Sequence, residues 1–387
     1  MNPTRIAPTL LAAATLAACG RSAGTPAEFL GAAPTSAQLA ISQNDGDPVE
    51  GTDASGDSTS AQALVGGECH PHLFVRTHEI IGRVNRHFFK HLHHVEELIA
   101  DHPLADGETK TWESTRAGLV RRFTMTRTAN LDGSTTFDFE LDIATAPAGD
   151  ASAFVKVMSG SVTHTGPAAT EAGVADAGAG ERVENKGVVN FDFTALASVS
   201  PRERARGLIT DTFDNVRDPA KGVKRSASIV LKDFIPEEGD RHGPRNGTYS
   251  WLREPGVGGK FQFQDTVTLF CLPNPTAAQS DLTTVARWYK ASDGQVHGRS
   301  DSKATGGQLT AGETWMGLTC AKGQTTAAPA EGFWMMKLED STGATLTSQS
   351  SQVGTEPCDA AFGPVPSAAN NSTDYDFSAE VTFPGEW

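Results

Sequence analysis

Long apolar runs are scarce in this chain of 387 residues. Beyond the first twenty residues, none reaches the roughly 18 residues that a transmembrane helix needs, so we expect no second membrane segment. Cysteine is also scarce, with five residues, and the C-x-x-C-H pattern of c-type haem attachment is absent. The sequence also contains no G-x-S-x-G, P-loop or dinucleotide-binding fingerprint. These absences argue against the enzyme classes that such motifs identify, but a site assembled from scattered residues stays open.

Basic residues are fewer than acidic residues, and the formal net charge is −15 at pH 7. A polyanion of this size repels phosphate backbones and anionic lipid headgroups. We therefore expect no nucleic-acid partner, whereas cationic partners and divalent ions stay open.

The amino terminus has the three parts of a secretory signal. A short basic start, Met1–Arg5, precedes an apolar run from Ile6 to Ala18 that is too short to span a bilayer. Its end, Leu16-Ala17-Ala18-Cys19, resembles the lipobox of bacterial lipoprotein precursors. The resemblance implies cleavage before Cys19, a diacylglycerol thioether on its sulfur and an acylated amino terminus. It implies a cell-envelope protein anchored in the membrane through this lipid, and Gly20 is typical of lipoproteins passed on to the outer membrane.

Composition divides the remaining chain into three parts. Residues 19–67 are rich in Ala, Ser, Thr, Gly and Asp and are predicted to form a disordered acidic tether. Residues 68–272 are predicted to form a helix followed by an antiparallel β domain. Residues 273–387 are predicted to be β-rich, either continuous with the same sheet or a small sandwich, with the boundary at Pro273-Asn274-Pro275.

One long amphipathic helix is predicted over Pro71–Ala100. Apolar residues recur there at intervals of three and four and form one stripe, namely Ile81, Val84, Phe88, Leu92, Val95 and Ile99.

After Gly107 the apolar period changes to two, which predicts half-buried antiparallel strands. Alternation is clearest over residues 137–143, 189–193, 261–271 and 375–383, and further strands are predicted near 208–216 and 226–235. The capping-box pattern Ser200-Pro201-Arg202-Glu203 predicts a short helix over about 201–206. The predicted fold is mainly β: a large antiparallel sheet (curved sheet, half-barrel or sandwich) with the long helix packed on it.

Four cysteines remain once Cys19 carries lipid: Cys69, Cys271, Cys320 and Cys358. An even number in an oxidising compartment predicts two disulfides, for which three pairings are possible. We favour Cys271 with Cys320 and Cys69 with Cys358, while one bridge plus two buried thiols is the alternative.

Histidines cluster on the predicted helix. At 100° per residue, His87, His91 and His94 lie within a narrow arc, and imidazoles so placed can face one Zn²⁺ or Cu²⁺ ion. The alternative is that His91 packs at the edge of the core and the other imidazoles are solvated.

Three functions follow from these features. The first is a non-catalytic binding module for a hydrophobic ligand or a protein partner; the order of a helix and then many strands is similar to that of the half-barrel carriers of lipids and lipoproteins. The second is a metal-binding protein using His87, His91 and His94. The third is a hydrolase with an unrecognised site. Ser300-Asp301-Ser302-Lys303 matches the Ser-x-x-Lys motif of penicillin-binding enzymes, but the other motifs of those enzymes are absent from the sequence.

Overall fold

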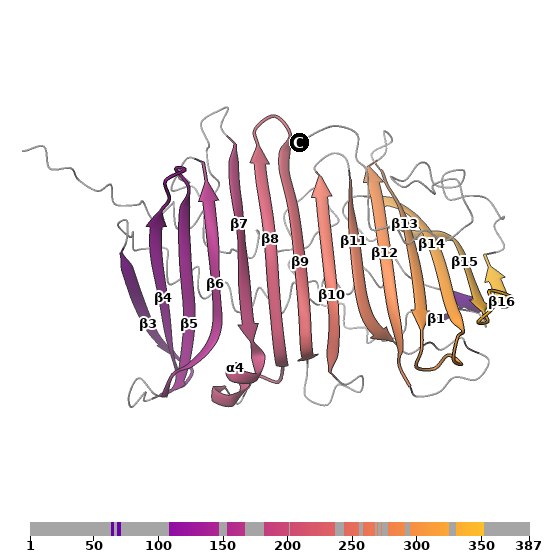
Figure 1. The fold of residues 1–387 in the computed structure, drawn as a ribbon, viewed down its shortest axis with the longest axis horizontal. Coiled ribbons are helices and arrows are strands. Elements are labelled where there is room, and N and C mark those ends of the chain that lie inside the picture. Colours follow the sequence, from indigo (N-terminus) through magenta and orange to yellow (C-terminus); the bar gives the residue numbers. More distant parts are fainter. Residues whose placement is uncertain are drawn as a thin grey trace, which may run out of the picture.

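The computed structural model describes residues 63–65, 68–70, 108–146, 153–166, 182–200, 202–236, 244–254, 258–267, 269, 272, 278–290, 295–324 and 330–351. Its main element is one sheet of fourteen antiparallel strands, β3 to β16, each paired with its neighbours in the sequence (Figure 1). This confirms the predicted mainly β, antiparallel fold class. The strands are β3 (Thr109–Arg116), β4 (Leu119–Ala129), β5 (Thr135–Thr145), β6 (Val155–Thr165), β7 (Val183–Asp192), β8 (Arg206–Asp218), β9 (Gly222–Ile235), β10 (Arg245–Glu254), β11 (Gly258–Val267), β12 (Ser280–Lys290), β13 (Gln295–Thr305), β14 (Thr314–Gln324), β15 (Ala330–Glu339) and β16 (Thr345–Ser350).

Two further strands form a separate hairpin. β1 (Ala63–Val65) pairs with β2 (Glu68–His70), and β2 lies near β15. β1 falls within residues 19–67, for which the sequence predicts a disordered tether. The predicted helix over residues 71–100 and the predicted strand over residues 375–383 lie outside the described residues and stay predictions. Beyond the boundary predicted at residues 273–275, β12 to β16 continue the same sheet.

Short turns connect several neighbouring strands. Between β4 and β5 the Asp132 carboxylate accepts hydrogen bonds from the Ser134 N–H at 2.9 Å and from its hydroxyl at 2.7 Å. Gly133 follows with φ of 85°, a conformation in which side chains are strained and glycine is not. The Asp340 carboxylate and Gly343, with φ of 82°, are arranged similarly between β15 and β16.

Cross-strand register places apolar side chains on one face of the sheet. Phe139 in β5, Val189 in β7, Ile229 in β9 and Phe263 in β11 lie in one row of paired residues across the strands, so they point to the same side. We call the side from β4 to β11 the apolar face. Its buried apolar members are Phe123, Met125, Phe137, Phe139, Leu141, Met158, Val162, Val189, Phe191, Ile209, Phe213, Ala227, Ile229, Leu231, Tyr249, Trp251, Phe261 and Phe263.

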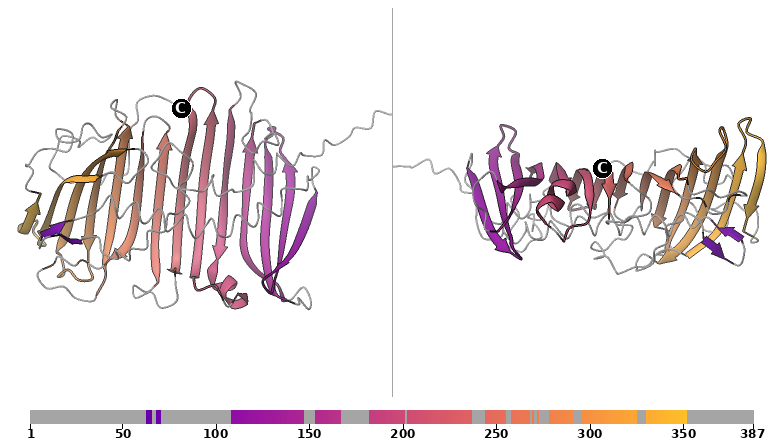
Figure 2. Two further views of the ribbon diagram at one scale, coloured as in Figure 1. Left: turned by 180° about the vertical axis from the view of Figure 1, so that it is seen from behind. Right: turned by 90° about the horizontal axis from the view of Figure 1, so that it is seen from below.

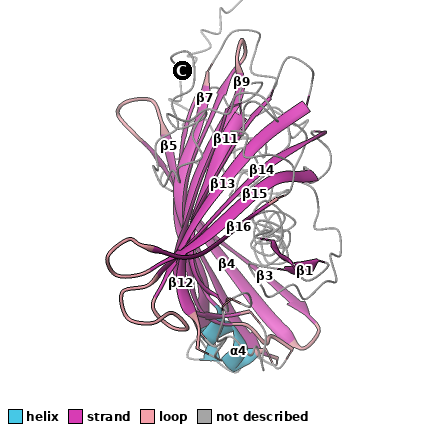
Figure 3. Ribbon diagram, turned by 90° about the vertical axis from the view of Figure 1, so that its right-hand side faces the viewer, coloured by secondary structure: helices cyan, strands magenta, loops and turns pink. Residues whose placement is uncertain are grey.

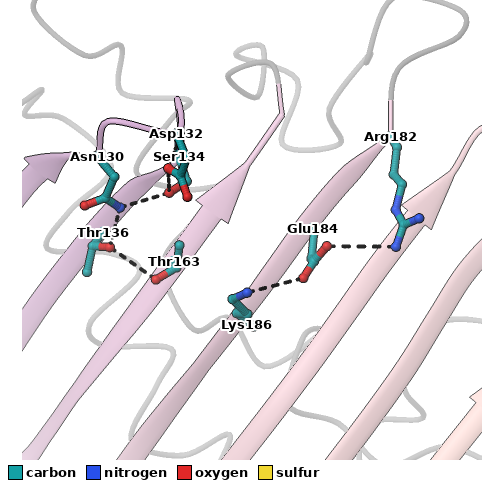
Figure 4. Close-up of polar contacts among 8 residues, drawn as sticks. All are labelled: Asn130, Asp132, Ser134, Thr136, Thr163, Arg182, Glu184 and Lys186. Carbon is teal, nitrogen blue, oxygen red and sulfur yellow. Dashed lines mark hydrogen bonds and ion pairs between the residues drawn. The ribbon is translucent and has the colours of Figure 1, made fainter.

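The opposite side of β3 to β7 is polar. Its contacts include hydrogen bonds between the hydroxyls of Thr136 and Thr163 at 3.2 Å and an ion pair of Glu184 with Lys186 at 3.7 Å (Figure 4). The alternation predicted from the sequence therefore corresponds to one face in a core and one face toward water.

Right-handed strand twist accumulates across the fourteen strands. Seen from below, the sheet is a single layer whose two ends tilt in opposite directions (Figure 2). From the side, the strands fan out around the middle of the sheet (Figure 3). A small twist of constant hand between neighbouring strands, added over the sheet, accounts for this shape.

The helix α4 (Phe193–Val199) corrects the prediction of a helix over about 201–206. The Asp192 carboxylate accepts a hydrogen bond from the Ala195 N–H at 2.8 Å and caps the helix, while Ser200 is the C-cap rather than the N-cap. Phe193 and Leu196 are buried in the same core as the apolar face, and this packing decides where the helix forms. No helix within the described residues is long and apolar enough to cross a membrane.

A second, smaller core lies on the other side of the sheet near its carboxyl-terminal end. Leu318, Cys320 and Phe333 are buried there together. Beside them three fully buried charged side chains meet: the Asp301 carboxylate accepts from Arg287 at 2.9 Å and from Arg299 at 2.8 and 2.9 Å. We call these three residues the arginine–aspartate triad.

Removal of the Asp301 carboxylate is expected to unfold the protein readily. Asp301→Ala leaves two guanidinium charges buried without this partner, which costs about 3–5 kcal/mol in free energy of unfolding. Asp281→Ala, at an exposed position on the neighbouring strand, is the control and is expected to change the free energy of unfolding by less than about 0.5 kcal/mol. Urea unfolding curves measure both, and equal midpoints for the two variants would contradict the expectation.

Candidate functional site

A carboxyl group lies in the middle of the apolar face. Asp211 in β8 is 0% exposed, and its cross-strand partners are Val189 in β7 and Ile229 in β9. Among the residues that the structure describes, neither carboxyl oxygen has a hydrogen-bond partner. A buried polar group without a partner costs free energy. An apolar residue at position 211 would therefore stabilise the fold more than Asp211 does.

Apolar side chains surround Asp211 on all four sides of this face. Ile209 and Phe213 precede and follow it on the same side of β8, and like Val189 and Ile229 they are buried. These four side chains contain no nitrogen or oxygen, so they cannot form a hydrogen bond with the carboxyl group.

Aromatic rings extend the site on the side of β10 and β11. The ring centroids of Tyr249 and Phe261 are 6.0 Å apart, those of Tyr249 and Phe263 6.1 Å, and those of Phe261 and Phe263 5.5 Å. Tyr249 is the cross-strand partner of Ile229, so this cluster begins two strands from Asp211. Rings in such contact form a large, rigid apolar surface.

Polar residues cross the apolar face near one end. Cross-strand pairs link them in one row, which we call the polar row: Thr135, His164, Asn185, Asn215, Arg225 and Arg253. Within it the His164 Nδ1 and Asn185 Oδ1 atoms are 2.7 Å apart. Asn215 is four residues beyond Asp211 on β8, about 13 Å along the strand. The helix α4 lies at the other end of the strands (Figure 1), so Asp211 occupies the apolar middle between them.

Burial raises the pKa of Asp211 to about 8, since removal from water disfavours the charged form. Near neutral pH the side chain is therefore mainly an uncharged carboxylic acid. It becomes a carboxylate when pH rises or when a positive charge comes next to it.

The site residues predicted from the sequence lie elsewhere. Cys19, His87, His91 and His94 lie outside the described residues, as do Cys271 and Cys358, and only the backbone of Cys69 in β2 is described. Cys320 is fully buried in β14 and is disulfide-bonded, while the predicted pairing of the four cysteines stays a prediction. In the described part of the chain, no three His, Cys, Asp or Glu residues gather as a metal site would require.

The Ser-x-x-Lys match does not form a catalytic pair. Ser300 and Lys303 lie on the same strand, β13, at positions of opposite parity, so their side chains point to opposite faces. Asp301, between them, belongs to the arginine–aspartate triad.

Asp211 was missed by the sequence analysis, although the sequence carries a signal for it. In the run Ile209-Thr210-Asp211-Thr212-Phe213 the aspartate stands where the two-residue period calls for an apolar residue. A charged residue in phase with the apolar face is the pattern that marks such a site.

Asp211 is expected to make stability fall as pH rises. Its folded pKa is raised from 3.8 to about 8, so its contribution is fully present below pH 4 and is lost as pH rises through 8. Between about pH 5 and 8, the free energy of unfolding of the natural protein should fall by up to about 1.4 kcal/mol per pH unit relative to Asp211→Asn. Urea unfolding at four pH values measures this difference, with Asp138→Asn on the exposed polar face as control. Parallel pH profiles for the natural protein and Asp211→Asn would contradict the assignment.

Comparison of the chain with protein-family models, with curated proteins and with solved structures gives no match in any of the three.

Proposed function

We propose that this chain is a lipid-anchored protein of the bacterial cell envelope and that it acts as a non-catalytic binding module for a hydrophobic ligand or a protein partner. The observation that carries the proposal is the apolar face, which eight neighbouring strands, β4 to β11, build; between the polar row and the end of the strands near α4, Asp211 is the polar residue in its middle. At a strand spacing of about 4.8 Å this face is about 34 Å wide. Such a surface suits an apolar molecule better than a small polar substrate.

The predicted helix over Pro71–Ala100 supplies a second apolar surface in the proposal. Its stripe of six apolar side chains is proposed to pack across the apolar face, and the ligand to lie between helix and sheet. This arrangement is similar to that of the half-barrel carriers of lipids and lipoproteins, which is an analogy of architecture.

The surroundings of Asp211 favour binding over hydrolysis. A hydrolytic carboxyl needs a nucleophile, a base or a second acid within hydrogen-bond reach. The side chains next to Asp211 on its own and the adjoining strands are all hydrocarbon. The metal hypothesis rests on His87, His91 and His94. It is tested by whether Zn or Cu is bound to the purified protein.

Lipidation at Cys19 is expected to be abolished by Cys19→Ala. The thioether requires the cysteine sulfur, so the variant cannot carry the diacylglycerol. Metabolic labelling with an alkynyl fatty acid should mark the natural protein and leave Cys19→Ala unlabelled. Cys320→Ala is the cysteine control, since that sulfur is buried in a disulfide and not in the lipidation motif; the variant should still be labelled. Label on Cys19→Ala would contradict the proposed anchor.

Binding is expected to depend on the apolar face and not on the opposite one. Ile229→Thr puts a hydroxyl on the apolar face, whereas Val230→Thr makes a comparable change at the next residue, which is 44% exposed on the other face. We expect Ile229→Thr to weaken binding of a fluorescent fatty-acid probe about tenfold, and Val230→Thr to leave it unchanged.

Native mass spectrometry of protein extracted from its own membrane tests the same proposal without a chosen probe. A retained hydrophobic molecule or protein partner supports it. Retained Zn or Cu alone would favour the metal hypothesis instead. If nothing is retained and the probe does not bind saturably, the proposed function is wrong.

A further inference from the structure

We propose that the apolar face binds an amphipathic amine, whose ammonium group pairs with the Asp211 carboxylate while its hydrocarbon part lies against the neighbouring apolar and aromatic side chains. The inference rests on the proposed function and names the chemical class of its ligand. The carboxyl group is fully buried, has no hydrogen-bond partner within the described part of the chain, and has as its nearest neighbours on β7, β8 and β9 side chains that cannot hydrogen-bond.

The fold itself does not need a carboxyl group at this position. Valine and isoleucine occupy the two cross-strand positions, and an aliphatic residue at position 211 would continue that row. The arginine–aspartate triad shows the contrast, because there the same protein buries a carboxylate with three hydrogen bonds from two arginines. Asp211 has the cost of burial without that compensation, which is typical of a group reserved for a ligand.

A protonated amine is the complement that these surroundings favour. A carboxylate in an apolar environment is stabilised strongly by an ion pair with short, charge-assisted hydrogen bonds. The rest of the ligand is expected to be mainly apolar, since Phe213, Phe261 and Phe263 are hydrocarbon and the Tyr249 hydroxyl belongs to a residue two strands from Asp211. The chain's net charge of −15 favours the approach of cations.

No other charged group stands close enough to compete for Asp211 among the described residues. On β8 itself the nearest charged group on this face is Arg217, six residues away, and on β9 it is Arg225, the partner of Asn215. The described part of β7 presents none on this face, and α4 contains no charged residue. The remaining titratable side chains described on this face lie two or more strands away: His164 on β6, Tyr249, Arg245 and Arg253 on β10, and Arg121 and Arg127 on β4.

Binding of the amine near pH 7 has a defined proton balance. In the free protein the Asp211 carboxyl is mainly protonated, because its pKa is about 8. The ligand arrives as an ammonium ion, Asp211 releases its proton to solvent, and the pair is carboxylate with ammonium. About one proton should be released per amine bound near pH 7, and far fewer at pH 9.5, where Asp211 is already ionised.

Calorimetric titration with three probes of equal chain length tests the proposal: dodecylamine, dodecanol and dodecanoate. The protein is the mature chain from residue 19, exported with Cys19→Ser so that it lacks the lipid and needs no detergent. We expect dodecylamine to bind about 10- to 100-fold more tightly than dodecanol, with proton release seen as a dependence of the heat on the buffer's ionisation enthalpy. Dodecanoate should bind most weakly.

Two variants test whether Asp211 is responsible for the preference for the amine over the alcohol. Asp211→Asn should bind amine and alcohol about equally and release no proton, whereas Asp138→Asn, which removes the same charge from the exposed polar face, should behave like the natural protein. Equal affinities for amine and alcohol in the natural protein would overturn the inference, and so would an amine preference that persists in Asp211→Asn. If none of the three probes binds, the inference is overturned, whereas the proposed function is overturned only if native mass spectrometry also finds no retained molecule or partner, so the two failures are distinguishable.

Discussion

Removal of one sheet face from water is the constraint on which this structure depends. A single layer of fourteen strands gains most of its stability from the side chains of the apolar face, because hydrogen bonds between strands largely replace hydrogen bonds to water. In every strand from β4 to β11, the same alternate residues must therefore face the core. A register slip of one residue in β8 would turn Ile209 and Phe213 to the polar side and bring Thr210 and Thr212 into the core. Short turns such as the one at Asp132 and Gly133 help to fix that register.

Two buried polar features depart from this pattern in opposite ways. The arginine–aspartate triad is fully paired, and it lies on the side of β12 and β13 that faces the second core. Asp211 is equally buried at the centre of the larger core and has no hydrogen-bond partner among the residues described there. The triad is a structural use of buried charge, in which each hydrogen bond offsets part of the desolvation cost. Asp211 has no such offset among the described residues, and this difference is the ground for the ligand that we propose.

Period-two alternation was enough to predict much of the sheet. The apolar positions at Phe137, Phe139, Leu141 and Ile143 are all buried, because alternation in a strand maps directly onto faces. The short helix was placed wrongly for a physical reason. Ser200 to Glu203 has the local pattern of a helix start, but burial of Phe193 and Leu196 stabilises the preceding segment instead. Local capping is worth about 1 kcal/mol, and packing of two large side chains exceeds it.

By itself the sequence determined the fold class, the alternation of faces and the signal-like start that ends at Cys19, since each depends on residues close together in the chain. Only the tertiary structure decided which residues meet. Val189 and Ile229 flank Asp211 from strands 22 and 18 residues away, and Arg287 reaches Asp301 across a hairpin. Whether a buried carboxyl is paired depends on neighbours that register brings together, and the sequence carries no direct record of register.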